Sequence, residues 1–435
     1  MMRSITVLGG GESGVGAALL AQKKGLEVFV SDYGEIEEKY RKELENHNIP
    51  FEEKGHTLDK IETTNVIVKS PGIPDKAPVI QYFRLRQKRI ISEIEFASKY
   101  YDGQIIAITG SNGKTTTTSL TYHLLSQSDK RIGLGGNIGT SFARLLLEEH
   151  RYDWVVLELS SFQLDDIDSF ESDISSILNI TPDHLDRYDY DFKKYGQAKW
   201  RLAESTKNHL ILNQDDDLLK RFAVKNPPKA EMHWLSSIKP NALLSKDSKE
   251  VFEINLKGRH NTFNASVAIK IARLFGLNDA KIKARLKSFQ AIEHRLETVA
   301  KINGIEFIND SKATNIDAVK YALEAMDVPV VWIAGGTDKG NEYDSILPLV
   351  KSKVKSLVCL CKDDSKLRSA FENDISDIIS KHSMQEAVSI AFERAVRGDV
   401  VLLSPACASF DLFKNYAHRG EEFKKSVFNL LSGSN

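Results

Sequence analysis

The residues richest in potential chemistry lie at 107–118, which read Ala-Ile-Thr-Gly-Ser-Asn-Gly-Lys-Thr-Thr-Thr-Thr. An apolar strand pattern at 104–108 leads into a glycine turn, and a helical pattern begins directly after it. In a phosphate-binding loop of this kind, backbone N–H groups surround a polyphosphate, a lysine balances its charge and a hydroxyl holds Mg²⁺. The form Thr109-Gly-x-x-Gly-Lys-Thr115 is shorter than the usual loop, but strand, turn and helix follow in the required order. We therefore predict a nucleoside triphosphate site.

Two further polar side chains follow apolar strand patterns in the same part of the chain. Glu158 lies in the pattern at 154–159, and His184 follows the pattern at 174–180. Because the carboxyl ends of neighbouring parallel strands meet at one sheet edge, we expect Glu158, His184 and Thr115 to surround the triphosphate. Carboxylate and hydroxyl oxygens suit Mg²⁺, and an imidazole can hold a second ion or its water. The alternatives are a helix-capping glutamate and a packed histidine.

A glycine pattern also follows the first strand of the chain. Gly9-x-Gly-x-x-Gly14 comes after the strand expected at 5–8, and Asp32 follows the strand expected at 27–31, as in a dinucleotide-binding fingerprint. The physical requirement is broader, because a glycine-lined helix N-terminus accepts any diphosphate and a carboxylate accepts hydroxyls of any nucleoside or sugar. We expect a diphosphate such as a UDP-sugar rather than NAD, with Ser70–Pro74 closing over it. A bare tight turn is the remaining alternative.

Three polar segments follow expected strands in the last third of the chain, namely Asn309–Asn315, Gly335–Gly340 and Ser404–Asp411. They would lie at the carboxyl ends of these strands, where open α/β sheets hold ligands. Lys312, Lys339 and Arg419 are cations in or near these loops. Each of them alone would be read as a solvated surface charge, but together they favour an anionic substrate.

Two segments between these regions are ambiguous by composition. Asn261 and Asn264 open a helical pattern, and their amides could read an adenine edge or cap the helix. Lys199 lies on an expected helix and by composition is an ordinary surface lysine.

Strand and helix patterns alternate along nearly the whole chain, which predicts an α/β fold. The expected strands fall in three blocks, at 5–8, 27–31 and 66–69, then 104–108, 154–159 and 174–180, then 306–308, 330–334, 357–360 and 400–403. We predict three domains, each built on a mainly parallel sheet with flanking helices. They are a Rossmann-like N-terminal domain (1–95), a P-loop ATPase central domain (96–296) and a Rossmann-like C-terminal domain (297–435).

Composition narrows the class of protein. The 435 residues contain 59 lysines and arginines against 60 acidic residues, so no basic excess points to a nucleic-acid partner. The three cysteines are too few for a disulfide framework, and no export signal precedes the first strand. No apolar run approaches the roughly 20 residues of a membrane span. We expect a monomeric cytoplasmic protein without membrane insertion.

Taken together, these segments resemble the Mur ligase family, the ATP-dependent amide-forming enzymes of cell-wall precursor synthesis. The general family marks are the loop at 109–115, Glu158, His184, the segment His260–Asn264 and Arg295. Finer segments look like the branch that adds D-glutamate; they are Gly136–Gly139, Glu158–Leu164, Asn309–Asn315 and Ser404–Phe423. The likeness spans all three blocks.

The resemblance implies a reaction and a set of site residues. D-Glutamate would be joined to UDP-N-acetylmuramoyl-L-alanine through an acyl phosphate, with ATP and two Mg²⁺ ions as cofactors and ADP and phosphate as products, in peptidoglycan synthesis. The catalytic residues implied are Lys114, Glu158, His184 and Lys199. The implied metal ligands are Thr115, Glu158, His184 and a carbamylated Lys199.

The implied binding residues fall into three groups. The ATP group is Gly110, Ser111, Asn112, Gly113, Lys114, Thr115, Thr116, Asn264, Arg295 and Asp310. The UDP-sugar group is Glu12, Ser13, Asp32, Tyr33, Gly72, Asn137 and His184. The D-glutamate group is Lys312, Thr314, Lys339, Ser409 and Phe410.

Three other functions compete with this prediction. Another Mur-type or folylpolyglutamate-type amide ligase would share the general marks. A nicotinamide-dependent dehydrogenase rests on the first fingerprint alone and leaves the phosphate-binding loop unexplained. A non-enzymatic nucleotide switch would explain that loop, but not the polar segments at the strand ends of the third block.

Overall fold

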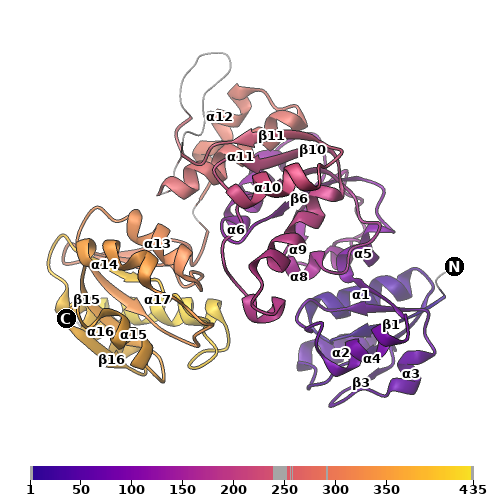
Figure 1. Ribbon diagram of the computed structural model, residues 1–435, viewed down its shortest axis with the longest axis horizontal. Coiled ribbons are helices and arrows are strands. Elements are labelled where there is room, and N and C mark those ends of the chain that lie inside the picture. Colours follow the sequence, from indigo (N-terminus) through magenta and orange to yellow (C-terminus); the bar gives the residue numbers. More distant parts are fainter. Residues whose placement is uncertain (1–2, 239–251, 255, 257, 291, 433–435) are drawn as a thin grey trace. The chain divides into compact units, whose positions relative to one another are not determined.

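The computed structural model describes residues 3–238, 252–254, 256, 258–290 and 292–432. Its strands form three separate sheets flanked by helices, which confirms the predicted α/β class (Figure 1). Contacts divide the chain into two compact units, one of Met1–Phe252 with Phe263–Leu286 and the other of Glu253–Thr262 with Lys287–Asn435. The first unit holds the first two sheets, and the second unit holds the third.

The first sheet is parallel, with the strand order β3-β2-β1-β4-β5. Its strands are β1 (Ser4–Leu8), β2 (Glu27–Ser31), β3 (Phe51–Glu52), β4 (Val66–Lys69) and β5 (Arg89–Ser92). Its helices are α1 (Glu12–Lys23), α2 (Glu38–Asn46), α3 (Leu58–Glu62), α4 (Pro78–Leu85) and α5 (Glu93–Ser98). Ile5 and Val7 pack on the α1 side while Leu8 packs with α3 and α4, because successive strand residues face opposite sides.

The second sheet is also parallel, in the order β11-β10-β9-β6-β8-β7. Its strands are β6 (Gln104–Thr109), β7 (Ile132–Gly136), β8 (Trp154–Glu158), β9 (Ser172–Ile177), β10 (Thr206–Asn213) and β11 (Glu231–Leu235). The helices are α6 (Lys114–Leu125), α7 (Phe142–Leu145), α8 (Ser161–Leu164), α9 (Phe192–Glu204), α10 (Asp217–Lys225), α11 (Arg259–Phe275) and α12 (Asp279–Ser288), with a 3₁₀ turn η1 (Leu185–Tyr188). Strands buried on both faces explain the continuous apolar runs of the sequence.

One strand of this sheet ends earlier than expected. The strand predicted to run to residue 180 stops at Ile177, and only the first residue after it, Leu178, still bonds to the neighbouring strand β6. The N–H of Leu178 donates to the carbonyl of Thr109, and the N–H of Ile180 donates to the Asp216 carboxylate. From Asn179 onward the segment after β9 therefore leaves the sheet, and Asn179 bonds to the loop that follows β6.

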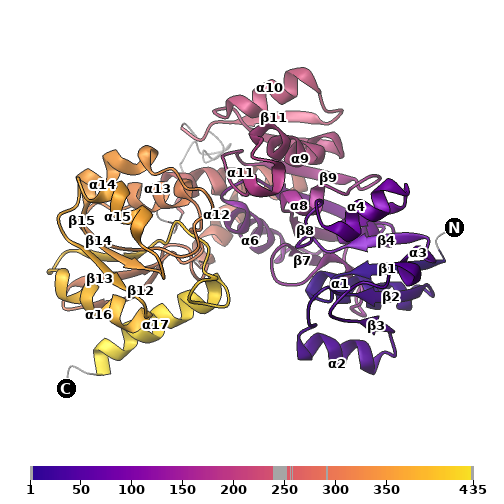
Figure 2. The ribbon, with the colours of Figure 1, turned by 60° about the horizontal axis from the view of Figure 1, so that its bottom comes forward.

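The third sheet has the order β12-β13-β17-β14-β15-β16, and only the edge strand β12 is antiparallel. Its strands are β12 (Glu297–Ile302), β13 (Ile305–Asn309), β14 (Val330–Ala334), β15 (Val354–Leu360), β16 (Ile378–Lys381) and β17 (Val400–Leu403). The helices are α13 (Ile316–Glu324), η3 (Asp344–Ile346), α14 (Leu347–Lys353), α15 (Ser365–Phe371), α16 (Met384–Arg394) and α17 (Tyr416–Ser432). Two separate clusters of buried side chains, one under α13 to α15 and one under α16 and α17, show that helices cover both faces (Figure 2).

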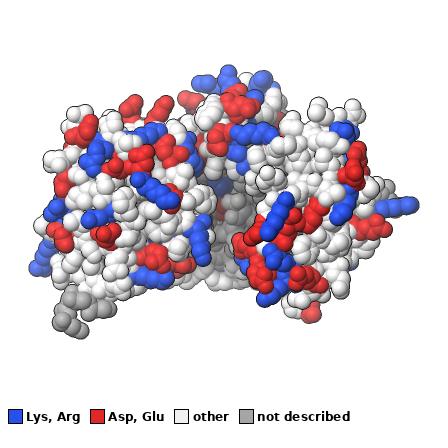
Figure 3. Space-filling view, turned by 90° about the horizontal axis from the view of Figure 1, so that it is seen from below, with Lys and Arg blue, Asp and Glu red and all other residues white. Residues whose placement is uncertain are grey.

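Charged side chains of both signs are interspersed on the face shown in Figure 3, in keeping with the net charge of −1. Among the described residues, no helix has the length and apolar character that a membrane span requires.

Candidate active site

The predicted phosphate-binding loop connects β6 to α6. Its last glycine, Gly113, has φ +85°, a value that favours glycine, and a Cβ there would lie 2.4 Å from Oδ1 of Asn264. Nζ of Lys114 donates to the carbonyl oxygens of Gly110 (2.8 Å) and Ser111 (2.9 Å). The loop therefore ends at a helix N-terminus, whose N–H groups and dipole favour an anion.

Residues that the sequence analysis did not select hold this loop in place. The N–H of Ser111 donates to the carbonyl of Asn179, and the N–H of Asn112 donates to the Asn179 side chain, both at 2.9 Å. The Ser111 hydroxyl donates to the carbonyl of Thr181 (2.8 Å) and lies 3.0 Å from the Tyr195 hydroxyl. Their sequence signal was weak, because Asn179 falls inside the strand expected at 174–180 and Thr181 comes directly after it.

Glu158 lies beside the loop, as predicted. It pairs with Ile108 on one side and with Gly136 on the other, so β8 brings it between β6 and β7. Oε1 of Glu158 accepts a hydrogen bond from Nδ2 of Asn137 at 2.8 Å, and the glutamate is almost fully buried. The structure thus brings together two residues that the sequence placed in different motifs.

Lys199 is not a surface lysine, because the side chain is fully buried on α9. Its Nζ donates to the carbonyl of Gly110 at 2.9 Å and lies 4.7 Å from the centre of the Tyr195 ring. Burial, followed by the positive charge of Lys114, holds the pKa of Lys199 well below its usual value. The surroundings of this amine, next to the predicted phosphate-binding loop, therefore disfavour its charged form.

His184 lies in the segment between β9 and η1. It has φ +52°, its ring packs edge-on to Phe162 with 5.1 Å between ring centres, and Nε2 is 3.6 Å from the Asp183 carboxylate. The negative charge of Asp183 also acts on Lys199 and Tyr195. Asp183 is a further acidic residue of this neighbourhood that the sequence analysis did not select.

At the first sheet, two of the residues predicted to bind a diphosphate ligand, Asp32 and Glu12, accept hydrogen bonds from other groups of the chain. Asp32 accepts hydrogen bonds from the N–H groups of Gly10 (2.6 Å) and Gly34 (2.7 Å). Glu12 accepts from the N–H of Ser141 (3.2 Å) and from Nε of Arg144 (3.0 Å). Asp32 therefore shapes the glycine turn directly, while Glu12 links it to the second sheet's loops.

The other residues predicted for this site are more open. Ser13 is half-buried, Gly72 is exposed, and Tyr33 is exposed over 79% of its surface. The hydroxyl of Ser70 donates to the carbonyl of Gly9, so the segment predicted to close over a ligand does lie against the glycine turn. Arg187 donates to the carbonyls of residues 71–73 and fixes that segment from the second sheet's side.

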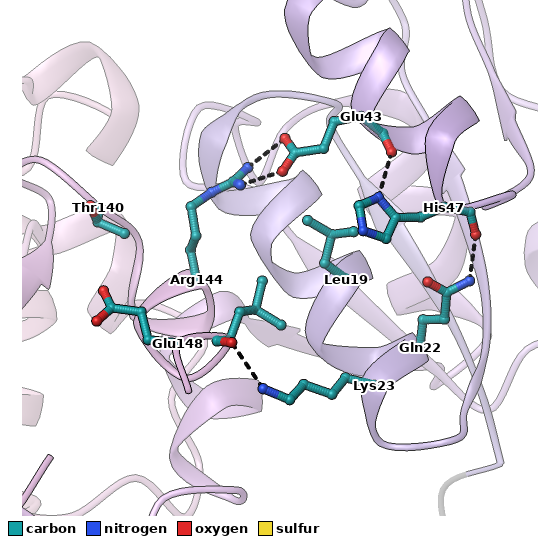
Figure 4. Close-up of a pocket in the computed structure, with 9 residues that line it drawn as sticks. Leu19, Gln22, Lys23, Glu43, His47, Thr140, Arg144 and Glu148 are labelled. Atoms are coloured by element: carbon teal, nitrogen blue, oxygen red, sulfur yellow. Dashed lines mark hydrogen bonds and ion pairs between the residues drawn. The ribbon is translucent and has the colours of Figure 1, made fainter. Parts of the chain in front are cut away.

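A groove of about 720 Å³ lies next to Arg144 (Figure 4). The charged side chains of Arg144, Glu43 and Lys23, which line it, are engaged in contacts within the protein. Arg144 forms a bidentate pair with Glu43 of α2, and Lys23 of α1 donates to the carbonyl of Leu147 at 2.9 Å. These charges bind other protein groups rather than pointing into the groove.

At the third sheet, Arg419 joins the three polar loops. It is 1% exposed, and its guanidinium donates four hydrogen bonds, to the hydroxyl and carbonyl of Ser311 and to the carbonyls of Gly335 and Cys407. The sequence analysis expected the positive charge of Arg419 to face an anionic substrate. The structure does not support this, because Arg419 is buried and its N–H groups donate to other groups of the protein.

The loops are also joined by their backbones. Thr337 and Ala408 exchange N–H···O bonds of 2.8 and 3.1 Å. Gly336 has φ +136°, and a Cβ there would lie 2.1 Å from the carbonyl oxygen of Ala408. Only a glycine fits this close approach, which explains the second glycine of the pair Gly335-Gly336.

The remaining predicted residues of this unit differ in exposure. Ser409 is buried and Phe410 is 74% exposed, while Lys312, Thr314 and Lys339 belong to the joined loops. Nζ of Lys312 lies 5.2 Å from the centre of the Tyr416 ring.

Asp310 begins the first of these loops and is buried. It accepts hydrogen bonds from the Ser404 hydroxyl (3.0 Å) and the N–H of Leu296 (3.2 Å), and burial raises its pKa to about 7 although the charge of Arg295 opposes this. Asp310 and Arg295 thus interact within the second compact unit.

Comparison with known proteins identifies the family to which this chain belongs. Family profiles match residues 4–79 (MurD N-terminal domain), 108–272 (Mur ligase middle domain) and 294–407 (Mur ligase, glutamate ligase domain). The chain belongs to the Mur ligase family. A UDP-N-acetylmuramoylalanine–D-glutamate ligase of Christiangramia forsetii is 47% identical over 99% of this chain and all of its own length.

Further comparisons place this Mur ligase among its relatives. A protein of the same name from Porphyromonas gingivalis is 46% identical over 98% of both chains. Among solved structures, the UDP-N-acetylmuramate-alanine ligase of Thermotoga maritima matches all of both chains with a TM-score of 0.63 and 20% identity, which supports the fold. Because the first fingerprint lies in a Mur ligase domain, the dehydrogenase alternative is not favoured.

Proposed function

We propose that this Mur ligase uses ATP to join D-glutamate to UDP-N-acetylmuramoyl-L-alanine, forming an amide bond in peptidoglycan precursor synthesis. The observation that carries the proposal is the 46–47% identity, over nearly the whole chain, to proteins named for that reaction. The phosphate-binding loop, with Lys114, Glu158 and Lys199 around it, supplies the triphosphate chemistry that the reaction requires.

The reaction has two steps. The L-alanyl carboxylate attacks the γ-phosphorus of ATP, which gives an acyl phosphate and ADP. The amine of D-glutamate then attacks the acyl carbon, and the C–O bond to phosphate breaks.

The barrier to the first step is largely electrostatic, since two unit charges about 4 Å apart repel by roughly 4 kcal/mol at an effective dielectric near 20. Lys114 and the N-terminus of α6 offset that repulsion. The incoming ammonium must also lose a proton, and His184 is our candidate to accept it at a stage when its imidazole does not coordinate a metal ion.

The donor set beside the loop fits magnesium. The Glu158 carboxylate and the Thr115 hydroxyl offer oxygen, which Mg²⁺ prefers, and His184 offers an imidazole. The amine of Lys199 is a poor magnesium ligand, but as a carbamate it would present oxygen, and its lowered pKa favours the neutral form that reacts with CO₂. We propose that these four residues hold two Mg²⁺ ions, whose role is to neutralise phosphate charge.

The remaining roles follow the same division. Gly110–Thr116 and Asn264 would bind ATP together with Arg295 and Asp310. The UDP-sugar would be bound by Glu12, Ser13, Asp32, Tyr33, Gly72, Asn137 and His184. D-Glutamate would contact Lys312, Thr314, Lys339, Ser409 and Phe410. These sites correspond to proposed domains at 1–95, 96–296 and 297–435, in a protein that we expect to act as a monomer in the cytoplasm.

Phosphate release tests the proposal. Purified protein with ATP, Mg²⁺ and UDP-N-acetylmuramoyl-L-alanine should release phosphate only when D-glutamate is added. A panel of L-glutamate, L-alanine, a diamino acid and a dipeptide separates this function from other Mur-type ligases, and replacing the nucleotide sugar by a folate separates it from the folylpolyglutamate type. Release with any of these in preference to D-glutamate would overturn the assignment.

A further inference from the structure

A second group of metal-binding side chains lies on the second sheet. His209 belongs to β10, and Glu231 and His233 belong to β11, the edge strand beside it (Figure 1). His209 pairs with Glu231 in the parallel register, and His233 follows two residues later, so all three side chains project from one face. Among the described residues, these are the only three His, Cys, Asp or Glu side chains whose donor atoms converge in this way.

The donor atoms already have the separations that one cation requires. Nδ1 of His209 lies 3.2 Å from Nε2 of His233 and 3.3 Å from Oε2 of Glu231, and Nε2 of His233 lies 3.8 Å from Oε1 of Glu231. Donors about 2.1 Å from a tetrahedral ion stand roughly 3.4 Å apart. Small side-chain rotations would therefore place all three around a single ion.

The backbone next to His209 is also irregular. The register between β10 and β9 shifts between Thr206 and His209, immediately before the first histidine. Such irregularities re-aim side chains and are frequent next to functional sites. Glu231 is 67% exposed, which leaves room for water to complete the coordination, whereas His233 is only 13% exposed.

The cluster is separate from the phosphate-binding loop. β9 lies between β10 and β6, which is a lateral distance of about 10 Å. His209 also precedes the carboxyl end of β10, Asn213, by four residues, and that end is the one on the side of the loop. The group therefore cannot be part of the proposed magnesium site.

We propose that His209, His233 and Glu231 form a binding site for a late first-row divalent cation, with Zn²⁺ as the expected ion. Two imidazoles and a carboxylate select such ions over Mg²⁺. The bound ion would link edge strand β11 to β10 and stabilise that edge. Lys270 of α11 lies near enough for its positive charge to act on His233, so we expect affinity in the micromolar rather than the nanomolar range.

Zinc titration of the full-length protein tests the proposal. After removal of metals by a chelator, Zn²⁺ is titrated against a chromophoric competitor in excess Mg²⁺, so that the oxygen-rich site beside the loop is occupied. Wild type should bind a single Zn²⁺ at this site and gain thermal stability from it. His233→Gln and His209→Gln should each weaken zinc binding at least about tenfold. His150→Gln, which changes an exposed histidine elsewhere, is the matched control and should bind as wild type does.

The outcome that overturns the site is equal zinc affinity in folded wild type and folded His233→Gln. If the histidine variants fail to fold, Glu231→Gln replaces them, because the Glu231 side chain is 67% exposed and its replacement leaves the buried packing unchanged. That variant must lower zinc affinity several-fold and reduce the zinc-induced rise in melting temperature. Unchanged values in it would equally refute the proposal.

Discussion

Lys199 and Lys114 donate to the same carbonyl oxygen, that of Gly110, at 2.9 and 2.8 Å. Lys199 stands 89 positions from that glycine in sequence and reaches it from the buried face of α9. Burial lowers the pKa of Lys199, and repulsion from the ammonium group of Lys114 at the same carbonyl lowers it further. The Gly110 carbonyl thus joins the lysine of the predicted phosphate-binding loop to a buried lysine whose charged form is disfavoured.

A buried amine with a lowered pKa predicts carbamylation of Lys199, because the neutral amine is the form that reacts with CO₂. Protein equilibrated with ¹³C-bicarbonate should show a carbamate carbonyl resonance that is lost in Lys199→Arg and kept in Lys193→Arg, a change of an exposed lysine on the same helix. Lys199→Ala should lose most activity and regain part of it with short carboxylic acids. A folded Lys199→Ala protein that no acid rescues, together with an absent resonance, would argue against a carbamate.

Replacing the loop lysine tests its electrostatic role. We expect Lys114→Ala to reduce turnover by at least about 10²-fold, because a major contact to developing phosphate charge is removed. The measurement is steady-state phosphate release, with Lys193→Ala as the control. Since Lys114 also donates to two loop carbonyls, the melting temperature must be recorded alongside. Near-normal turnover in a stable Lys114→Ala protein would be incompatible with the assigned role.

Asp310 predicts a specific pH dependence of stability. Its pKa rises from 3.8 to about 7 on folding, so between these values the folded state keeps a proton that the unfolded state releases. The stability that this provides is fully present below about pH 4 and is lost as the pH rises through about 7, with roughly 4 kcal/mol as an upper bound.

Urea unfolding of wild type and Asp310→Asn, without nucleotide, measures this contribution at several pH values. The variant keeps an acceptor for the N–H of Leu296 but cannot ionise. Its stability relative to wild type should therefore increase between pH 5 and 8. Parallel curves for the two proteins would show that Asp310 does not titrate in this range.

Arg419 is predicted to be indispensable for the geometry of the third sheet's loops. Arg419→Lys cannot reproduce four hydrogen bonds to three separate segments, so we expect a loss of about 2–4 kcal/mol in the free energy of unfolding. The KM for D-glutamate should rise more than the KM for ATP. Arg397→Lys, at an exposed position, provides the comparison. Unchanged stability in Arg419→Lys would mean that the loops hold their form without this side chain.

The sequence by itself determined the fold class, the family and the strand–turn–helix order of the predicted phosphate-binding loop. These depend on local order: an apolar strand, a glycine turn and a helix follow one another, and Glu158 lies at a strand end where parallel sheets collect ligands. Such patterns occur within about ten residues, and no knowledge of packing is required to read them.

The tertiary structure alone decided which polar groups meet. Burial of Lys199 depends on how α9 packs against the sheet, and composition suggested a surface position. Arg419 looked like a substrate cation, but its donors are used by loops that lie up to 108 positions away in sequence. The pairing of His209 with Glu231 requires the register of two parallel strands. Long-range contacts of this kind depend on chain topology and strand register, which residue type and local spacing do not encode.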